Sequence, residues 1–278
     1  MGQDLEQRED GIFRIARRVA PNRVISTVDP EARHGHKTQS RSFDGYKGHI
    51  AVDPDSEIIV QTQVTPGNTG DAEVTDQLLS DVLGQDPQAN KAASVEAYGD
   101  ASYGTADNVE KLEAAGIEAN VKVQAPSAAK GKFSKNHFAI YIESKTVRCP
   151  AGHVVEIAPS KDGGGTAVFG SRCAGCPLRE KCTESKEGRS ISVHPKEATL
   201  KEARERQKAP EWKAKYRSTR PKVERKFGHM MARRHGGRRA RVRGCGRVCQ
   251  DFALLGAAIN LKRLAVLGVR HTATGWSC

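Results

Sequence analysis

The sequence predicts an α/β protein built on a mixed β-sheet with flanking helices. Two β-branched, partly alternating segments at 46–53 and 57–65 predict antiparallel strands joined by a tight turn at 54–56. Further along, two predicted strands alternate with a predicted helix, a pattern typical of parallel pairing. Four of the seven cysteines lie in a stretch rich in Gly, Ser and Lys that interrupts this pattern, so we expect a cysteine-rich insert in the fold.

The first half of the chain supplies most of the predicted sheet. Residues 1–23 are polar and irregular, and we interpret them as an entry segment that precedes a strand at 23–29. After the hairpin, apolar residues at helical spacing predict a helix that begins with Asp71 as N-cap and stops at Gly84. These segments open the first part of the core.

A strand, a helix and a second strand complete this first part, which we place at residues 24–125. The segment 94–102 predicts a short strand that ends at Asp100. The helix over 104–116 is closed by Gly116, and the last strand covers 117–123. A strand that ends at an acidic residue can present a carboxylate at the edge of a sheet, although Asp100 is equally suited to cap a turn or helix.

The remaining chain divides into an insert at 126–195 and a basic helical part at 196–278 that completes the core. Helices are predicted over 196–218 and 222–236, separated by Pro221, and over 247–268. The last helix is amphipathic. The residues predicted to face its core are Phe252, Leu255, Ala258, Ile259 and Leu261.

Charge is the clearest functional signal in the composition. The net charge is +12, and residues 200–250 hold a large share of the 45 Lys and Arg residues but few acidic ones. A polyanion is the natural partner of such a stretch. The longest apolar run, at 252–259, is too short to span a membrane, and the acidic N-terminus is unlike a secretory signal. We therefore expect a cytoplasmic protein without a membrane partner.

Four cysteines have the spacing of a metal site. They occur as RCPAGH followed by RCAGCPLREKC, and the C-x-x-C turn can place two thiolates on one tetrahedral ion. We predict a structural Zn²⁺ site made by Cys149, Cys173, Cys176 and Cys182. His153 can replace one cysteine, and a redox pair or unliganded thiols remain alternatives. Cys245, Cys249 and Cys278 lack such grouping, so we expect them to be ordinary core or surface residues.

Five separated motifs resemble those of bacterial insertion-sequence transposases. They are FDGYKGHIAVDPDSEIIVQTQVTPGNTGDAE, YGDASYGT, CAGCPLREKC, RPKVERKFG and NLKRLA, and they occur in this order between about residues 24 and 266. The chain is most similar to the DDE subgroup that carries a cysteine-containing insert before its last acidic residue. The resemblance implies a ribonuclease-H-like fold that transfers phosphoryl groups, with DNA, both transposon ends and target, as partner and a homo-oligomer as the active form.

In that family two Asp and one Glu hold two divalent ions, Mg²⁺ or Mn²⁺, which activate the attacking hydroxyl and stabilise the leaving oxygen. The resemblance places the second Asp at Asp100 and the Glu at Glu224. Family members carry the first Asp on a strand well upstream of the STVDPEA segment. We therefore expect that strand to be missing here, with Asp29 and Asp53 as weaker replacements and a catalytically incomplete chain as the consequence.

Glu224 lies in a very basic stretch, where a plain surface ion pair is the simple alternative to a metal ligand. Tyr216, Arg220 and Glu224 fall on one helical face if Pro221 lies in the first turn of the helix. The family spacing differs for the Tyr, and Met231 stands where relatives have Lys. We expect the DNA backbone to be contacted by Tyr216, Arg217, Arg220, Arg233, Arg234, Arg238 and Arg239.

Two further functions are compatible with these features. A non-catalytic, DNA-binding remnant of a transposase would use the same basic helices without cutting DNA. A zinc-stabilised RNA-binding protein is favoured only by charge and cysteines, and its stacking residues are scarce because aromatic residues make up 5% of the chain. Transposase function therefore remains the leading prediction.

Overall fold

The computed structural model describes residues 5–7, 11, 13–15, 20, 23–38, 40–272 and 275–277. It divides into two compact units, one formed by residues 1–90 with 215–278 and the other by residues 91–214. Each unit is described by itself. Within the described residues, no helix is both long and apolar enough to cross a membrane.

The first unit is built on a three-stranded antiparallel sheet of β3 (Arg33–Thr38), β4 (Arg41–Val52) and β5 (Ile59–Pro66). The predicted hairpin between β4 and β5 is confirmed, with Tyr46 opposite Pro66 and Val52 opposite Ile59. Its turn is closed by the Asp53 N–H, which donates to the Ile58 carbonyl at 2.9 Å. Glu57 has a φ of 57° in this turn, a left-handed backbone conformation that lies outside the range of β-strands.

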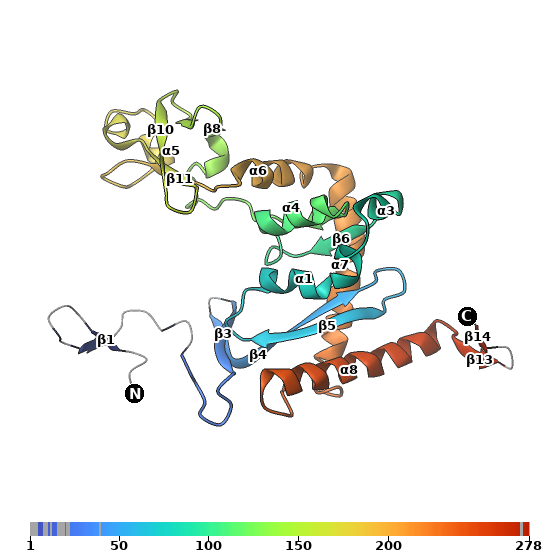
Figure 1. Ribbon diagram of the computed structural model, residues 1–278. Coiled ribbons are helices and arrows are strands. Elements are labelled where there is room, and N and C mark those ends of the chain that lie inside the picture. Colours follow the sequence, from blue (N-terminus) through green and yellow to red (C-terminus); the bar gives the residue numbers. More distant parts are fainter. Residues whose placement is uncertain are drawn as a thin grey trace. The chain divides into compact units, whose positions relative to one another are not determined.

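Helix α8 (Cys245–Val266) packs on this sheet, as Figure 1 shows below β4 and β5. The contact is close because two glycines carry no Cβ: a Cβ added at Gly48 would lie 2.7 Å from the Phe252 ring, and one added at Gly256 would lie 3.1 Å from the Thr62 side chain. The Asn260 side chain accepts from the Ile59 N–H at 2.9 Å and donates to the Ile59 carbonyl at 2.8 Å. Side chain and backbone thus fix the helix against the first residue of β5.

The core under α8 is smaller than the sequence predicted. Phe252 and Ile259 are buried and Leu255 packs against them, as expected. The prediction was wrong for Ala258, which is exposed, and for Leu261, which is 68% exposed. Both lie on the side of the helix away from the sheet, because the buried positions recur at 248, 252, 256 and 259.

The predicted helix after β5 is interrupted. It consists of a 3₁₀ turn η1 (Asp71–Val74), α1 (Thr75–Leu78) and α2 (Ser80–Leu83), followed by α3 (Pro87–Ala92), which the sequence did not predict. Gly84 ends α2 as expected. Asp71 is not the N-cap: the Glu73 carboxylate accepts from the Gly70 N–H at 2.8 Å, while Asp71 pairs with Lys47 on β4 at 3.0 Å.

Both ends of the chain contain short two-stranded ribbons. Residues 1–23 were predicted to be irregular, but the described part pairs β1 (Leu5–Gln7) with β2 (Phe13–Ile15). Near the other end, β13 (Arg270–Thr272) pairs with β14 (Gly275–Ser277). The strand predicted at 23–29 is absent, because the Ser26 hydroxyl accepts from the N–H groups of Val28 and Asp29 and curls the backbone.

The second unit contains the predicted strand–helix–strand element. β6 (Glu96–Gly99) and β7 (Glu118–Val121) pair in parallel, and α4 (Ala106–Ala114) connects them. Gly116 follows α4 with a φ of 73°, the left-handed conformation that favours glycine after a helix. These predictions are confirmed, with the strands shorter than expected.

Helix α6 (Glu197–Arg206) packs along α4 in the same unit (Figure 1). The Lys196 ammonium lies 2.6 Å from the carboxylates of both Asp107 and Glu110 on α4. The Thr199 hydroxyl donates to Glu110 at 2.7 Å. Polar contacts therefore align the two helices.

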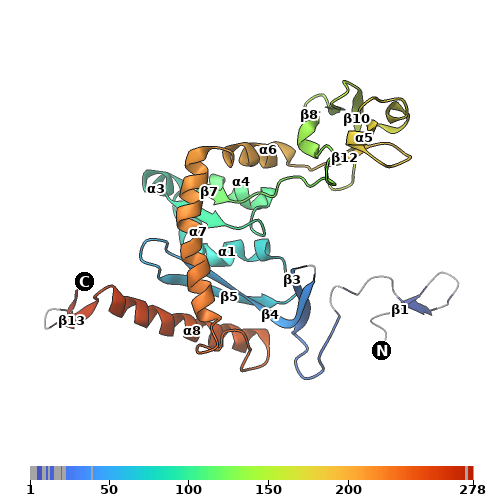
Figure 2. The same ribbon diagram turned by 180° about the vertical axis from the view of Figure 1, so that it is seen from behind.

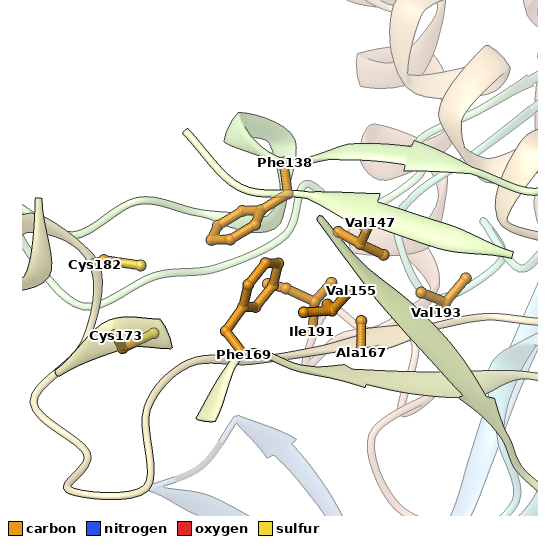
Figure 3. Close-up of a cluster of buried hydrophobic side chains, with 9 residues drawn as sticks. All are labelled: Phe138, Val147, Val155, Ala167, Phe169, Cys173, Cys182, Ile191 and Val193. Carbon is orange, nitrogen blue, oxygen red and sulfur yellow. The ribbon is translucent and has the colours of Figure 1, made fainter. Parts of the chain in front are cut away.

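Residues 126–195 contain a five-stranded antiparallel sheet in the order β12–β11–β10–β9–β8. Its nine-residue core, drawn in Figure 3, includes Phe138, Phe169, Cys173 and Cys182. The elements of this region are η2 (Lys135–His137), β8 (Ala139–Tyr141), β9 (Thr146–Arg148), β10 (Val154–Pro159), β11 (Gly165–Val168), η3 (Gly170–Cys173), α5 (Arg179–Cys182) and β12 (Ser190–Val193).

The helical boundaries after residue 196 differ from the prediction. α6 ends at Arg206, and α7 (Pro210–Met230) is a single helix with Pro221 inside it, seen along its length in Figure 2. Pro210 occupies the first helical position, where the missing N–H costs nothing. The break therefore falls before Pro210 instead of at Pro221, and residues 231–236, which were predicted to be helical, lie outside α7.

Candidate functional site: carboxylates, basic surface and a cysteine cluster

Glu224 lies on α7 in the row predicted from the sequence. Tyr216, Arg220 and Glu224 follow one another every four residues within one continuous helix, although Pro221 is not in its first turn. The Glu224 side chain is 63% exposed, and the Nε of Arg220 lies 3.7 Å from its carboxylate. This separation is too long for a hydrogen bond, so the carboxylate oxygens keep their acceptor capacity.

The opposite face of α7 is fixed to the hairpin of the first unit. Lys226 is buried, and its ammonium lies 3.5 Å from the Glu57 carboxylate. Arg225 donates a hydrogen bond to the same carboxylate and is the main reason that the pKa of Glu57 lies below its usual value. These contacts of Arg225 and Lys226 with Glu57 fix the orientation of α7 about its own axis. In this orientation Glu224 is exposed.

Five arginines predicted to contact DNA are exposed. Within the described residues, no carboxylate pairs with any of Arg217, Arg233, Arg234, Arg238 and Arg239. Arg238 donates to the Met231 carbonyl at 3.0 Å, and Arg234 contacts the ring of His235 at 3.1 Å. Their positive charges are therefore not neutralised locally, which makes 217–239 a basic surface.

Asp100 immediately follows β6 in the second unit and is half-buried. Its carboxylate accepts from the Ser102 N–H at 2.9 Å, and its carbonyl accepts from the Tyr103 N–H at 3.1 Å. The residue therefore begins a turn at the carboxyl end of a parallel strand. Asp100 and Glu224 belong to different units, so their convergence remains a prediction.

Asp29 and Asp53, the two alternatives for a third carboxylate, have structural roles in the first unit. Asp29 accepts from the Tyr46 hydroxyl at 2.6 Å and from the Gly244 N–H at 3.3 Å. Burial, with this hydrogen bond, raises the pKa of Tyr46. Asp53 accepts from the N–H groups of Ser56 and Asp55, and its hydrogen bond from the Ser56 hydroxyl lowers its pKa. The Asp29 carboxylate thereby joins β4 to the start of α8, whereas the Asp53 carboxylate stabilises the turn that follows it.

The four grouped cysteines line one cavity in the second unit together with His153. Cys173 and Cys182 are buried, with their sulfur atoms directed toward the aromatic pair of Phe138 and Phe169 (Figure 3). Cys149 packs against the same core and Cys176 is half-buried. Burial raises the pKa of the Cys182 thiol. The sequence spacing thus brings all four residues to one place.

Two tight turns present these cysteines: the predicted C-x-x-C turn and a second turn at Cys149 that was not predicted. The Cys176 N–H donates to the Cys173 carbonyl at 3.4 Å, and the Gly152 N–H donates to the Cys149 carbonyl at 2.9 Å. Even so, within the described residues no three His, Cys, Asp or Glu side chains are arranged as a group that could hold a metal ion.

Comparison with known proteins identifies part of the chain. Residues 148–265 match the family model described as a transposase DDE domain. Over this range the chain is similar to the transposase DDE domain family. No curated protein and no solved structure matches the chain. The matched transposase DDE domain segment includes the four grouped cysteines, Glu224 and the basic surface, whereas Asp100 lies outside it.

Three residues of the transposase DDE domain segment were missed by the sequence analysis. Glu197 is buried between Lys135 and Arg204, and Arg179 and Arg189 surround the cysteines. Charged residues in a basic, polar stretch give no local signal of burial. Cys245 and Cys249 pack against the core under α8, as expected, and Cys278 lies outside the described residues.

Proposed function

We propose that this chain is the DDE part of a DNA transposase, which cuts and joins transposon ends by metal-dependent phosphoryl transfer. The match of residues 148–265 to the transposase DDE domain supports this proposal. A ribonuclease-H-like arrangement of the mixed α/β elements is the fold that the family implies. Within this function, residues 217–239 bind DNA, and Asp100 and Glu224 serve the chemistry.

The observation that carries the DNA-binding role is the set of exposed arginines without acidic partners on the basic surface. An arginine already paired with a carboxylate contributes little to the field around a protein, whereas an unpaired one attracts phosphate strongly. Arg217 on α7 and the four arginines of the following irregular segment present such groups. Phosphate contacts position a duplex without reading its sequence, so this surface sets affinity and leaves end recognition to other contacts.

Glu224 suits a metal-ligand role because its carboxylate makes no hydrogen bond to the described residues and is largely exposed. Carboxylate oxygens are the ligands that Mg²⁺ and Mn²⁺ prefer. In this chemistry a bound divalent ion lowers the pKa of the attacking hydroxyl and stabilises charge on the leaving oxygen. We assign the ligand role to Asp100 and Glu224, and phosphate contacts to Arg220 and Tyr216 beside Glu224 on α7.

The proposed set has two carboxylates, one fewer than the three that DDE chemistry uses. Asp29 and Asp53 are poor candidates for the third because each already accepts hydrogen bonds, Asp29 from Tyr46 and Gly244 and Asp53 from the turn that follows it. Moving either carboxylate onto an ion would leave those donors without a partner. We therefore expect residues 1–278 alone to bind DNA but to cut it poorly, with the first Asp supplied by another segment.

Binding of Mn²⁺, followed by electron paramagnetic resonance, tests the carboxylate assignment without requiring cleavage. Asp100→Asn and Glu224→Gln are expected to weaken Mn²⁺ binding while leaving DNA affinity unchanged. Glu211→Gln is the matched control, since Glu211 is an exposed carboxylate on the same helix. If Glu224→Gln binds Mn²⁺ as well as the unaltered chain does, Glu224 is a surface ion-pair residue. Strong Mg²⁺-dependent cleavage by residues 1–278 would restore Asp29 or Asp53 as the third ligand.

A non-catalytic, DNA-binding remnant is the second candidate. The Arg220–Glu224 contact at 3.7 Å favours it, because an exposed i,i+4 pair of this kind is common on helices that bind no metal. This candidate predicts the same salt-dependent DNA binding but no effect of Glu224→Gln on Mn²⁺. The Mn²⁺ experiment therefore separates the two candidates.

A further inference from the structure

Two guanidinium groups beside the cysteine cavity have no anionic partner among the described residues. Arg179 donates to the carbonyls of Cys173 and Ser185, both at 2.9 Å. Arg189 donates to the carbonyls of Phe133 at 3.2 Å and Cys182 at 3.5 Å. Within residues 91–214, all of which are described, neither arginine pairs with a carboxylate.

Arg189 is half-buried at the cysteine cavity. Its Nε atom is buried and makes no hydrogen bond within the described residues, and its guanidinium carbon lies 5.7 Å from the centre of the Phe138 ring. A buried N–H without an acceptor costs roughly 1–3 kcal/mol, and more when the group is charged. Such a group indicates an acceptor, preferably an anion, at this position.

The thiols of the cavity are the available source of negative charge. Cys149, Cys173, Cys176 and Cys182 line it together with Arg179 and Arg189. The backbone N–H of Arg189 already donates to the Cys173 sulfur at 3.5 Å. Amide donors of this kind stabilise a thiolate more than a thiol. The surrounding donors are thus suited to sulfur that carries charge.

We propose that Cys149, Cys173, Cys176 and Cys182 bind one Zn²⁺ as thiolates and that the Nε of Arg189 donates to this cluster. Four thiolates contribute a charge of −4, Zn²⁺ contributes +2, and the two arginines together contribute +2, so the site is neutral as a whole. Protonated thiols would leave both arginines uncompensated. His153 is exposed and is not needed as a ligand. Binding of the ion as thiolates displaces the thiol protons to solvent.

The bound ion also explains how such a small sheet is stable. β8 to β12 contain between three and six residues each, and their core comprises nine buried residues. A core of this size rarely supplies enough burial on its own, so small modules commonly use a structural metal. Cys149 precedes β10, whereas the other three cysteines lie between β11 and β12. One ion would therefore join two loops that the sheet leaves unconnected.

Metal analysis of the full chain, purified under reducing conditions without chelators, tests the site. We expect about one equivalent of zinc per chain, consistent with one tetrahedral site. The double variant Cys173→Ser with Cys176→Ser is expected to lose that zinc. Cys249→Ser is the matched control, because Cys249 lies in the first unit with its sulfur 3.7 Å from the Gln63 side chain. Less than about half an equivalent after incubation with zinc, or zinc retained by the double variant, would overturn the proposal.

Competition with a chromogenic chelator tests the role of Arg189. Arg189→Gln is expected to weaken zinc binding by about 10- to 100-fold, as loss of outer-shell partners typically does. Arg189→Lys keeps the charge and should restore part of this affinity. Cobalt substitution provides a second measurement, since the visible absorption of tetrahedral Co²⁺–thiolate reports whether four sulfurs still bind. Unchanged zinc affinity in Arg189→Gln would refute its part in the site, and neither experiment depends on DNA cleavage.

Discussion

Replacing Glu197 by Gln is expected to destabilise the second unit strongly. The Glu197 side chain is 5% exposed, and it pairs with the Lys135 ammonium and, at 2.6 Å, with Nη2 of Arg204. It also accepts from the His194 N–H at 3.2 Å. Gln removes the negative charge and turns an amide NH₂ toward these donors. Lys135 and Arg204 then stay as buried cations without a counter-charge.

The magnitude follows from the burial of the two cations. Breaking a buried ion pair by removing one partner typically costs about 3–5 kcal/mol. The side chains of Lys135 and Arg204 keep 19% and 12% exposure, so partial hydration reduces the penalty. We therefore expect Glu197→Gln to lower the free energy of unfolding by about 3 kcal/mol at neutral pH.

The pH dependence of the same variant provides an independent check. Burial alone would raise the pKa of Glu197, but the hydrogen bonds from Lys135 and Arg204 prevail, so its pKa is lower in the folded chain. The stabilisation is therefore present above the unfolded pKa of about 4.3 and is lost as pH falls through the lower folded value. The difference between Glu197→Gln and the unaltered chain should accordingly shrink in acid.

Urea denaturation followed by far-UV circular dichroism at neutral and acidic pH measures both effects. Glu205→Gln is the control, because Glu205 pairs with Lys208 at the surface, with both side chains about 60% exposed. We expect no measurable change from this control. The reasoning fails if Glu197→Gln unfolds at the same urea concentration as Glu205→Gln, or if its deficit persists undiminished in acid.

Two further predictions concern the packing of α8 and the basic surface. Gly48→Ala is expected to cost about 1–3 kcal/mol in urea denaturation, because its Cβ would lie 2.7 Å from the Phe252 ring, whereas Gly246→Ala, with no atom within 4 Å, should cause no loss. Equal stability of the two variants would contradict the packing described for α8. Reversing Arg238 and Arg239 to Glu should reduce the log–log salt slope of DNA binding by about 2, since each phosphate contact contributes about 0.9. The control replaces the exposed Lys161 and Lys186 by Glu. An equal change of the salt slope in both double variants would refute the assignment of Arg238 and Arg239 to DNA binding.

Local sequence patterns determined much of the secondary structure. The β4–β5 hairpin, α4 with its terminal Gly116 and the parallel pair β6–β7 follow from side-chain alternation, helical spacing and turn residues that act within a few positions. The same is true of the two turns that bring Cys149 and Cys176 to the cavity, because thiol spacing is a local property. The matched range of the transposase DDE domain likewise agrees with the motifs in the second half of the chain.

Only the tertiary structure decided which side chains are buried and with what partners. Leu261 fits an amphipathic pattern, yet it is exposed because the sheet covers one face of α8. Asp71 is a good N-cap by type, but Lys47, which is 24 positions away, takes its carboxylate. The sequence around Glu197 and Arg189 predicts solvated charges. In the fold, segments that are distant in sequence enclose both side chains. Burial and charge pairing depend on contacts between remote segments, and for this reason local composition predicted where the cysteines gather but not the arginines that surround them.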